Sequence, residues 1–191
     1  MRVSREKFAE NRQKILEVAG VLFRENGFDG IGVADIMKAA GLTHGGFYGH
    51  FGSKDDLAFE VSRGLIVRVE ERWKAIIASA PERPLAALLD HYLSQRNVLE
   101  HGDSCIFASM MQEVSRQTGP VRDTFSQGLV RLVDLLEGIV PGQSAEERRA
   151  NAFSTLSAIM GAVILARVVE DPEDAEMFLK GTRRQLLPDS A

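Results

Sequence analysis

The side chains that could do chemistry gather in one short stretch of the N-terminal third, and their types suit contact with nucleic acid. Histidine, tyrosine, threonine and lysine supply hydrogen-bond donors and acceptors and one fixed positive charge. Two adjacent glycines lie among them, where they would let the backbone approach a ligand closely. These groups match the chemistry of phosphate oxygens and base edges. The candidate residues are Thr43, His44, Gly45, Gly46, Tyr48, His50 and Lys54.

Lys54 is the candidate with the clearest preference for phosphate. Ser53 is a suitable N-cap for a helix that begins at Lys54, and Asp56 stands three residues after it, in the position of a capping box. A cation in the first turn opposes the helix dipole. A bound phosphate would resolve that conflict, because it suits both the lysine and the helix N-terminus.

Two short helices are expected to position these side chains. Apolar residues at spacings of three and four predict a helix over 33–40, and Gly41 is the residue type that ends a helix in a left-handed turn. Thr43 is a good N-cap for a second helix, which would bury Phe47 and Phe51. Two helices joined by a tight glycine turn form a helix-turn-helix, the unit that places its second helix in the major groove of DNA.

The stretch from Gly27 to Leu57 resembles the DNA-binding domain of the TetR/AcrR family of transcriptional regulators. Three phrases carry the resemblance: Ala40-Gly41-Leu42-Thr43, Phe47-Tyr48-Gly49-His50-Phe51 and Ser53-Lys54-Asp55-Asp56-Leu57. They cover about the first third of the chain, and the rest matches the family only in size and helical character. Members usually carry a threonine before the first helix of the motif. Here those positions are Gly30, Ile31 and Gly32, so a phosphate-binding hydroxyl is missing.

The resemblance implies an all-α chain of about nine helices with two functional parts. A three-helix head with the helix-turn-helix would occupy 1–53, and a larger helical body for ligand binding and dimerisation would occupy 54–191. The chain would be a ligand-responsive repressor that binds a pseudo-palindromic operator as a homodimer and is released by a small-molecule inducer. Its partners would be double-stranded operator DNA, an unknown small-molecule effector and a second copy of itself.

Charge and composition fit a protein that docks one end on DNA. Residues 1–54 carry eight basic and six acidic side chains, whereas residues 55–191 carry 15 basic and 21 acidic ones, within a net charge of −4. Arg5, Lys7 and Arg12 stand near the start of the first predicted helix, where they could meet phosphates. The N-terminus lacks the apolar stretch of a signal peptide, and the single Cys105 fits a reducing cytosol. We therefore expect a cytoplasmic protein.

The remaining helices are predicted from apolar spacing and from glycine and proline positions. A long helix over 54–79 would connect the head to the body. The other helices are expected at 8–26, 84–101, 105–118, 121–140, 145–169 and 174–187. No strand pattern with a period of two occurs in the sequence.

The helix predicted over 145–169 is apolar over an unusually wide surface. This indicates either a central core helix or packing against a second chain, and the resembling family pairs its last two helices across a two-fold axis as a four-helix bundle. Its most apolar run, Phe153 to Val169, is short of a membrane span, so no membrane partner is expected. The candidate interface residues are Phe153, Leu156, Met160, Val163 and Ile164.

Methionine and aromatic residues of the body are candidates for an apolar effector pocket, although residues of these types at helical spacing also form ordinary core. The pocket candidates are Trp73, Phe107, Met110, Met111 and Phe125, with His91, Tyr92 and Cys105 as further possibilities. Cys105 would act as a redox sensor if it were exposed at a helix N-terminus, and as an inert thiol if buried.

The sequence offers no catalytic constellation, and no cofactor or metal is expected. No G-x-S-x-G, P-loop or H-E-x-x-H motif occurs, and His91 and His101 have no metal-ligand spacing with each other or with Cys105. The chain is therefore interpreted as a regulator and not an enzyme. The alternatives are a transcriptional activator, a helical small-molecule-binding protein, or a protein–protein adaptor whose helix-turn-helix is only structural.

Overall fold

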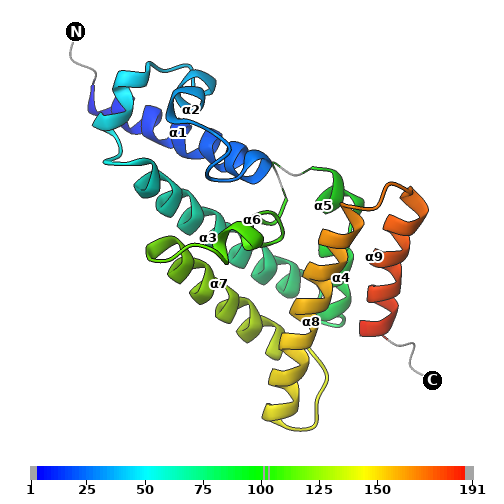
Figure 1. The fold of residues 1–191 in the computed structure, drawn as a ribbon. Coiled ribbons are helices and arrows are strands. Elements are labelled where there is room, and N and C mark those ends of the chain that lie inside the picture. The colour runs from blue at the N-terminus through cyan, green and yellow to red at the C-terminus, as the bar shows by residue number, and fades with distance from the viewer. Residues whose placement is uncertain (1–3, 101, 103, 188–191) are drawn as a thin grey trace. The chain divides into compact units, whose positions relative to one another are not determined.

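The computed structural model describes residues 4–100, 102 and 104–187, and every regular element within them is a helix (Figure 1). This confirms the all-α prediction with about nine helices for the described residues. In chain order the elements are α1 Arg5–Asn26, α2 Val33–Ala39, the 3₁₀-helix η1 His44–Gly49, α3 Lys54–Ser79, α4 Pro84–Tyr92, α5 Gln95–Leu99, α6 Ile106–Val114, α7 Pro120–Glu137, α8 Ala145–Ala166 and α9 Pro172–Leu186.

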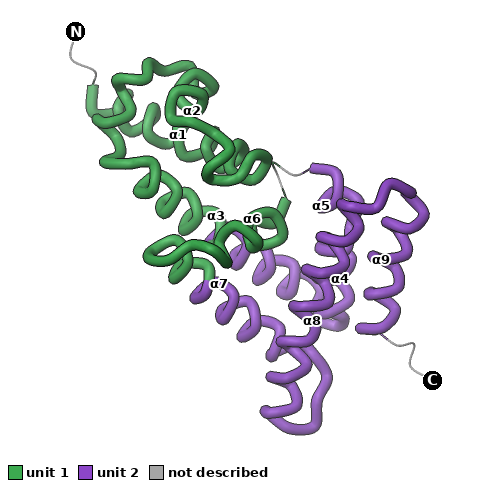
Figure 2. The backbone as a smooth tube through the Cα atoms, in the orientation of Figure 1, with its two compact units in different colours: residues 1–66, 101–125 green, residues 67–100, 126–191 purple. Residues whose placement is uncertain are grey.

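The chain divides into two compact units (Figure 2). Unit 1 comprises residues 1–66 and 101–125, and unit 2 comprises residues 67–100 and 126–191. Unit 1 therefore holds α6 and the first half of α3 in addition to the helix-turn-helix. The division into a head over 1–53 and a body over 54–191 concerns function, and it stays a prediction.

The core of unit 1 forms where α1 packs against α2 and α6. Ile15, Ala19 and Phe23 lie on the buried stripe of α1. The helix begins before this stripe, at Arg5, because the Ser4 hydroxyl accepts the Lys7 N–H at 3.1 Å and so caps its first turn. The predicted start at residue 8 followed the apolar spacing and missed that cap.

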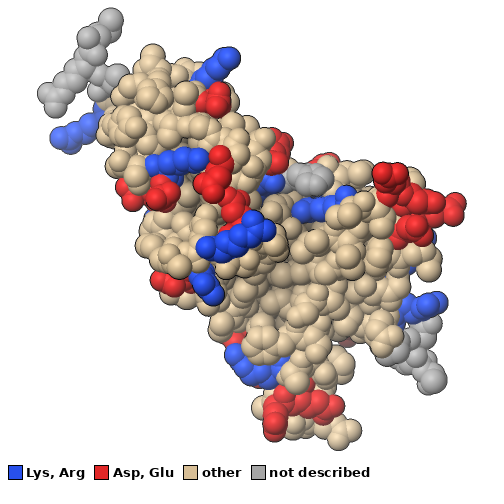
Figure 3. Space-filling view, viewed as in Figure 1, with Lys and Arg blue, Asp and Glu red and all other residues tan. Residues whose placement is uncertain are grey.

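Unit 2 contains α8 and α9, which pack against each other and are both capped at their starts. The Ser144 hydroxyl accepts the Glu147 N–H at 3.1 Å, and the Glu147 carboxylate accepts the Gln143 N–H at 2.7 Å. Asp171 accepts the Glu173 N–H at 2.8 Å and precedes Pro172. Acidic side chains gather at both first turns, where the helix dipole favours negative charge (Figure 3).

A single helix over 84–101 was the wrong prediction, because the chain breaks between α4 and α5. Side chains satisfy the carbonyls that the break releases: the Asn97 amide donates to the Tyr92 carbonyl at 2.8 Å, and the Ser94 hydroxyl donates to the His91 carbonyl at 2.9 Å. No glycine or proline marks this break in the sequence. The predicted end of the helix, His101, lies outside the described residues.

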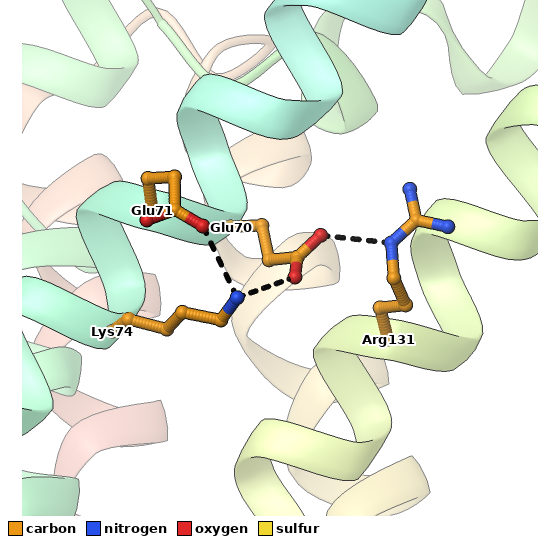
Figure 4. Close-up of polar contacts among 4 residues, drawn as sticks. All are labelled: Glu70, Glu71, Lys74 and Arg131. Atoms are coloured by element: carbon orange, nitrogen blue, oxygen red, sulfur yellow. Dashed lines mark hydrogen bonds and ion pairs between the residues drawn. The ribbon is translucent and has the colours of Figure 1, made fainter.

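A charged cluster joins α3 to α7 within unit 2 (Figure 4). The Arg131 Nε donates to Glu70 Oε2 at 2.8 Å, and Lys74 Nζ lies 2.7 Å from Glu70 Oε1 and 3.1 Å from Glu71 Oε1. The hydrogen bond from Lys74 lowers the pKa of Glu70, burial opposes this shift, and Arg131 adds to it. Two cations thus hold Glu70 in its charged form.

Helix α8 is longer at its start than the apolar run seen in the sequence. By length and composition alone Ala145–Ala166 could cross a membrane, a test that core helices of other proteins also pass. Within unit 2 it buries a face of seven residues: Ala152, Thr155, Leu156, Ile159, Ala162, Val163 and Ala166.

Candidate nucleic-acid interface

The helix-turn-helix of the structure consists of α2, a glycine turn and η1. Gly41 has φ +67°, and the Leu42 N–H donates to the Met37 carbonyl at 2.8 Å, so α2 ends in the left-handed turn that the sequence predicts. The second element is a six-residue 3₁₀-helix, not the longer α-helix that a recognition helix suggests. Thr43 stands at its N-cap position, but its side chain makes no cap hydrogen bond.

The face of η1 that points away from the core carries most of the predicted contact residues. Phe47 is fully buried, whereas the Tyr48 beside it is 66% exposed. The Tyr48 ring stands edge-on to both neighbours, with its centroid 5.3 Å from that of Phe47 and 6.3 Å from that of His44. These ring contacts orient the side chain of Tyr48, which is otherwise largely exposed. The exposed candidates are Thr43, His44, Gly45, Gly46 and Tyr48.

Gly45 has no structural requirement within the protein. A Cβ atom built at this position would meet nothing within 4 Å, and its φ is not in the left-handed region. A glycine here costs helix stability without gaining any contact inside the described chain. The open space in front of it suits close approach by a partner.

His50 differs from the expected projecting phosphate contact. Its ring stacks on Phe8, with centroids 4.1 Å apart, and its Nδ1 is buried without a hydrogen-bond partner. Burial lowers the pKa of His50, and the nearby charge of Arg12 lowers it further. The fold therefore favours the uncharged ring, which packs between the first helix and the motif.

The start of α3 has the cap that the sequence predicts. The Asp56 N–H donates to the Ser53 hydroxyl at 3.0 Å, and Lys54 is the first helical residue. Lys54 is half-buried and has no ion pair among the described residues. It lies on the wall of a cavity of about 620 Å³ in unit 1, together with Phe28, Asp29, Phe59 and Arg116.

Arg12 is not available as the phosphate contact that its position in the sequence suggested. Its guanidinium donates to both carboxylate oxygens of Glu60 at 2.5 and 2.6 Å, and it stands 4.8 Å from the centroid of the Phe51 ring. This pair ties α1 to α3 and orients the motif between them. Sequence reasoning missed it because 48 residues separate the two side chains.

The pocket candidates lie in two different units. In unit 1 the rings of Phe107 and Phe125 meet edge-on at 5.5 Å, Met110 is buried and Met111 is half-buried. In unit 2 Trp73 is buried against Tyr92, with ring centroids 5.7 Å apart. The cavity beside Lys54 and a second one of about 420 Å³ near Met177 are lined by other residues. An effector pocket at the five candidates stays a prediction.

The interface candidates of α8 face two directions. Phe153 and Ile164 are exposed and Met160 is half-buried, whereas Leu156 and Val163 belong to the buried face of unit 2. Leu156 and Val163 are buried in the single chain, so Phe153 and Ile164 offer more surface to a second copy, and the interface stays a prediction. Cys105 is buried at the N-cap of α6. Within the described residues no cluster of three His, Cys, Asp or Glu side chains could hold a metal ion.

Comparisons with known proteins agree with this geometry. Residues 15–61 match the model of a family described as bacterial regulatory proteins, tetR family. The HTH-type transcriptional repressor DhaR of Mycobacterium sp. (strain GP1) is 24% identical over 188 residues, which cover 93% of this chain and 92% of that protein.

Solved structures show the same fold. The crystal structure of a TetR transcriptional regulator from Chloroflexus aurantiacus J-10-FL has a TM-score of 0.80 at 22% identity and covers 96% of this chain and 97% of that one. The structure of AibR in complex with isovaleryl coenzyme A and operator DNA has a TM-score of 0.67 at 22% identity and covers 93% and 98% of the two chains.

Proposed function

We propose that the chain is a one-component repressor of the tetR family of bacterial regulatory proteins, whose family model matches residues 15–61. It binds a pseudo-palindromic operator as a homodimer in the cytoplasm and leaves the operator when a small molecule binds. The observation that carries the proposal is the exposed face of η1. There hydrogen-bonding side chains surround a glycine that the protein itself does not need.

The proposed DNA contacts fall into two classes: contacts to base edges, which specify sequence, and contacts to phosphates, which position the protein. Thr43, His44, Gly46 and Tyr48 meet base edges or phosphates, because they lie on the exposed face of the second motif element. Lys54 binds a phosphate at the start of α3, where the backbone N–H groups of the first turn also favour an anion. His50 stacks on Phe8 and supports the motif from the side of α1.

The exposed apolar face of α8 supports the homodimer. Phe153 and Ile164 are 50% and 39% exposed, which leaves apolar surface in water on a helix whose other face is buried. A second copy of the chain would cover it. Two-fold symmetry would then place two helix-turn-helix motifs on two operator half-sites.

The effector is a small molecule of unknown identity that shifts the chain toward a state with lower operator affinity. Release requires that the effector bind this state more tightly by a few kcal/mol. AibR, a protein with a similar fold, was solved in complex with isovaleryl coenzyme A and operator DNA, which supports the proposal that a chain of this fold binds both a small molecule and DNA. For this chain the apolar candidates around Phe107 and Phe125 are the proposed contact region.

The variant Lys54→Ala tests the proposed DNA binding most directly. An operator selected from a random DNA pool is titrated with wild type and variant across a salt series. We expect the variant to bind more weakly. We also expect the slope of the logarithm of the binding constant against the logarithm of the salt concentration to be smaller by about one unit per subunit, because one phosphate contact is lost.

The matched control for this experiment is Lys180→Ala, which removes an exposed lysine that pairs with Glu176 in unit 2. It should keep the wild-type slope. An unchanged slope in Lys54→Ala would contradict the phosphate role. Failure of the wild type to select any sequence would contradict the repressor itself.

A further inference from the structure

A carboxylate from α6 holds the turn between the first two helices of unit 1. The Phe28 N–H donates to Glu113 Oε2 at 2.9 Å, and the Asp29 N–H donates to Glu113 Oε1 at 3.1 Å. Both oxygens of one side chain are therefore used by two successive backbone amides. The two partners lie 85 and 84 residues apart in the sequence.

The turn is shaped to receive this carboxylate. Gly27 has φ +78°, and a Cβ atom there would stand 2.8 Å from Glu113 Oε2, so a side chain would be strained and would also collide with the carboxylate. The next residue anchors the turn from inside, since the buried Phe28 ring meets Phe23 edge-on at 5.1 Å. In this turn the N–H groups of Phe28 and Asp29 both point toward the Glu113 carboxylate.

A second contact ties α1 to the segment before α6. The Arg24 guanidinium donates to the Gly102 carbonyl. Arg24 thus connects Gly102 to α1, and Glu113 connects the end of α6 to the turn that follows α1. These contacts connect α6, which packs on α1, to the rest of unit 1.

We propose that Glu113 is a positioning residue for operator binding, an inference that rests on the proposed repressor function. The turn at Phe28 and Asp29 leads directly into α2, and η1 packs on α2. Hydrogen bonds from two amides to a charged acceptor are stronger than neutral ones. The carboxylate therefore sets where α2 and η1 lie relative to α1 and α6, although it is not itself a DNA contact.

Three variants test this role. Glu113→Gln keeps the shape but replaces one acceptor oxygen with an NH₂ group that faces an N–H. Glu113→Asp keeps the charge with a shorter reach. Glu82→Gln is the matched control, since it removes the same charge from an exposed glutamate that has no hydrogen bond or ion pair within the described residues. This control matters because loss of any negative charge raises general affinity for DNA.

Two readouts separate positioning from general stability. Amide hydrogen exchange, followed by NMR without DNA, reports on the Phe28 and Asp29 N–H groups themselves. Operator affinity is measured well below the unfolding midpoint of each variant. For Glu113→Gln we expect exchange at these two amides to rise about tenfold or more and operator affinity to fall about tenfold, in line with the loss of a charge-assisted hydrogen bond. The salt slope should not change, because no phosphate contact is removed.

Glu113→Asp should lie between wild type and Glu113→Gln in both readouts, and Glu82→Gln should match wild type. The proposal is overturned if the two amides exchange faster while operator affinity equals that of the Glu82→Gln control. It is also overturned if their exchange does not change, or if both Glu113 variants fail to fold, since the contact would then be a requirement of folding alone. If the wild type binds no operator, the proposed repressor function is overturned. The exchange data are taken without DNA, so they still show whether Glu113 holds the two amides.

Discussion

His50 shows how a residue in the middle of a DNA-binding motif can be used for packing. Its ring stacks on Phe8 at 4.1 Å and also lies 6.3 Å from the Phe51 ring, centroid to centroid. Burial lowers the pKa of His50, and the charge of Arg12 lowers it further. Arg12 itself is held by Glu60, so its charge stays close to the histidine. The folded protein therefore favours the neutral imidazole.

This preference gives the stability of the protein a pH dependence of known sign. The unfolded chain binds the His50 proton near the ordinary pKa of 6.5, and the folded chain binds it only at lower pH. The stabilisation is complete above 6.5, and it is lost as the pH falls through the folded pKa. In His50→Gln we expect the free energy of unfolding to fall less steeply between about pH 7.5 and about pH 5.5. The difference in slope should correspond to at most about one proton, the one that the unfolded wild type binds at His50 and the folded wild type does not.

Urea unfolding at several pH values measures this slope, and NMR titration of the His50 ring gives its folded pKa directly. His91→Gln is the comparison, because burial also lowers the pKa of His91, with further lowering by Arg72 and Arg96. His91→Gln should keep the part of the pH dependence of the free energy of unfolding that comes from His50. A folded pKa of His50 at or above 6.5 would contradict the packing role.

Individual side chains were predictable where local spacing decides their place. Phe47 and Phe51 are buried and Tyr48 is exposed, as their positions in the motif indicate. The environment of His50 was not predictable, because Phe8 comes from the start of the chain. The same holds for the Glu113 contact. Nothing in the sequence marks one exposed-looking glutamate as the partner of two backbone amides so far away.

Between elements, the link from α3 to α7 rests on one carboxylate with two cations. Glu70 is largely shielded from solvent, whereas Glu71 next to it is exposed and shares only Lys74. Hydrogen bonds from charged partners to a shielded carboxylate contribute more than an exposed ion pair does. Glu70 should therefore matter to unit 2, and Glu71 should not.

Glu70→Gln is expected to lower the free energy of unfolding by roughly 1 kcal/mol at neutral pH. Since the pKa of Glu70 lies below its ordinary 4.5, its stabilisation is complete above 4.5 and is lost as the pH falls through the folded value. The difference between variant and wild type should thus shrink in acid. Urea unfolding at neutral and acid pH measures this, with Glu71→Gln as the control. Equal effects of the two substitutions would contradict the distinction.

The elements themselves were predicted well where the chain has strong signals. The helix over 54–79 was placed correctly at both ends, because Ser53 caps its start and Pro81 follows its end. The break between α4 and α5 was missed because side-chain hydrogen bonds from Ser94 and Asn97 produce it, not glycine or proline. The 3₁₀ form of η1 was also missed, although Gly45, Gly46 and Gly49 weaken any α-helix there.

At the scale of the assembly, α8 has a buried face and an exposed apolar face. Leu156 and Val163 pack inside unit 2, whereas Phe153 and Ile164 lie in water in the single chain. Packing inside one subunit explains why Leu156 and Val163 are apolar, but it does not explain the apolar side chains of Phe153 and Ile164. The wide apolar surface seen in the sequence thus separates into a core half and a half that the proposed homodimer would cover.

Ile164→Asp tests that division. A carboxylate at the centre of an apolar interface would be buried without a partner, which costs several kcal/mol per subunit on association. We expect the variant to sediment as a monomer at about 10 µM, where the wild type sediments as a dimer, and to bind the full operator about a hundredfold more weakly, because one helix-turn-helix reaches only one half-site. Val67→Asp is the control, since Val67 is 48% exposed on α3 and lies outside the proposed interface. An Ile164→Asp variant that stays dimeric with wild-type operator affinity would show that this face of α8 is not where two copies meet.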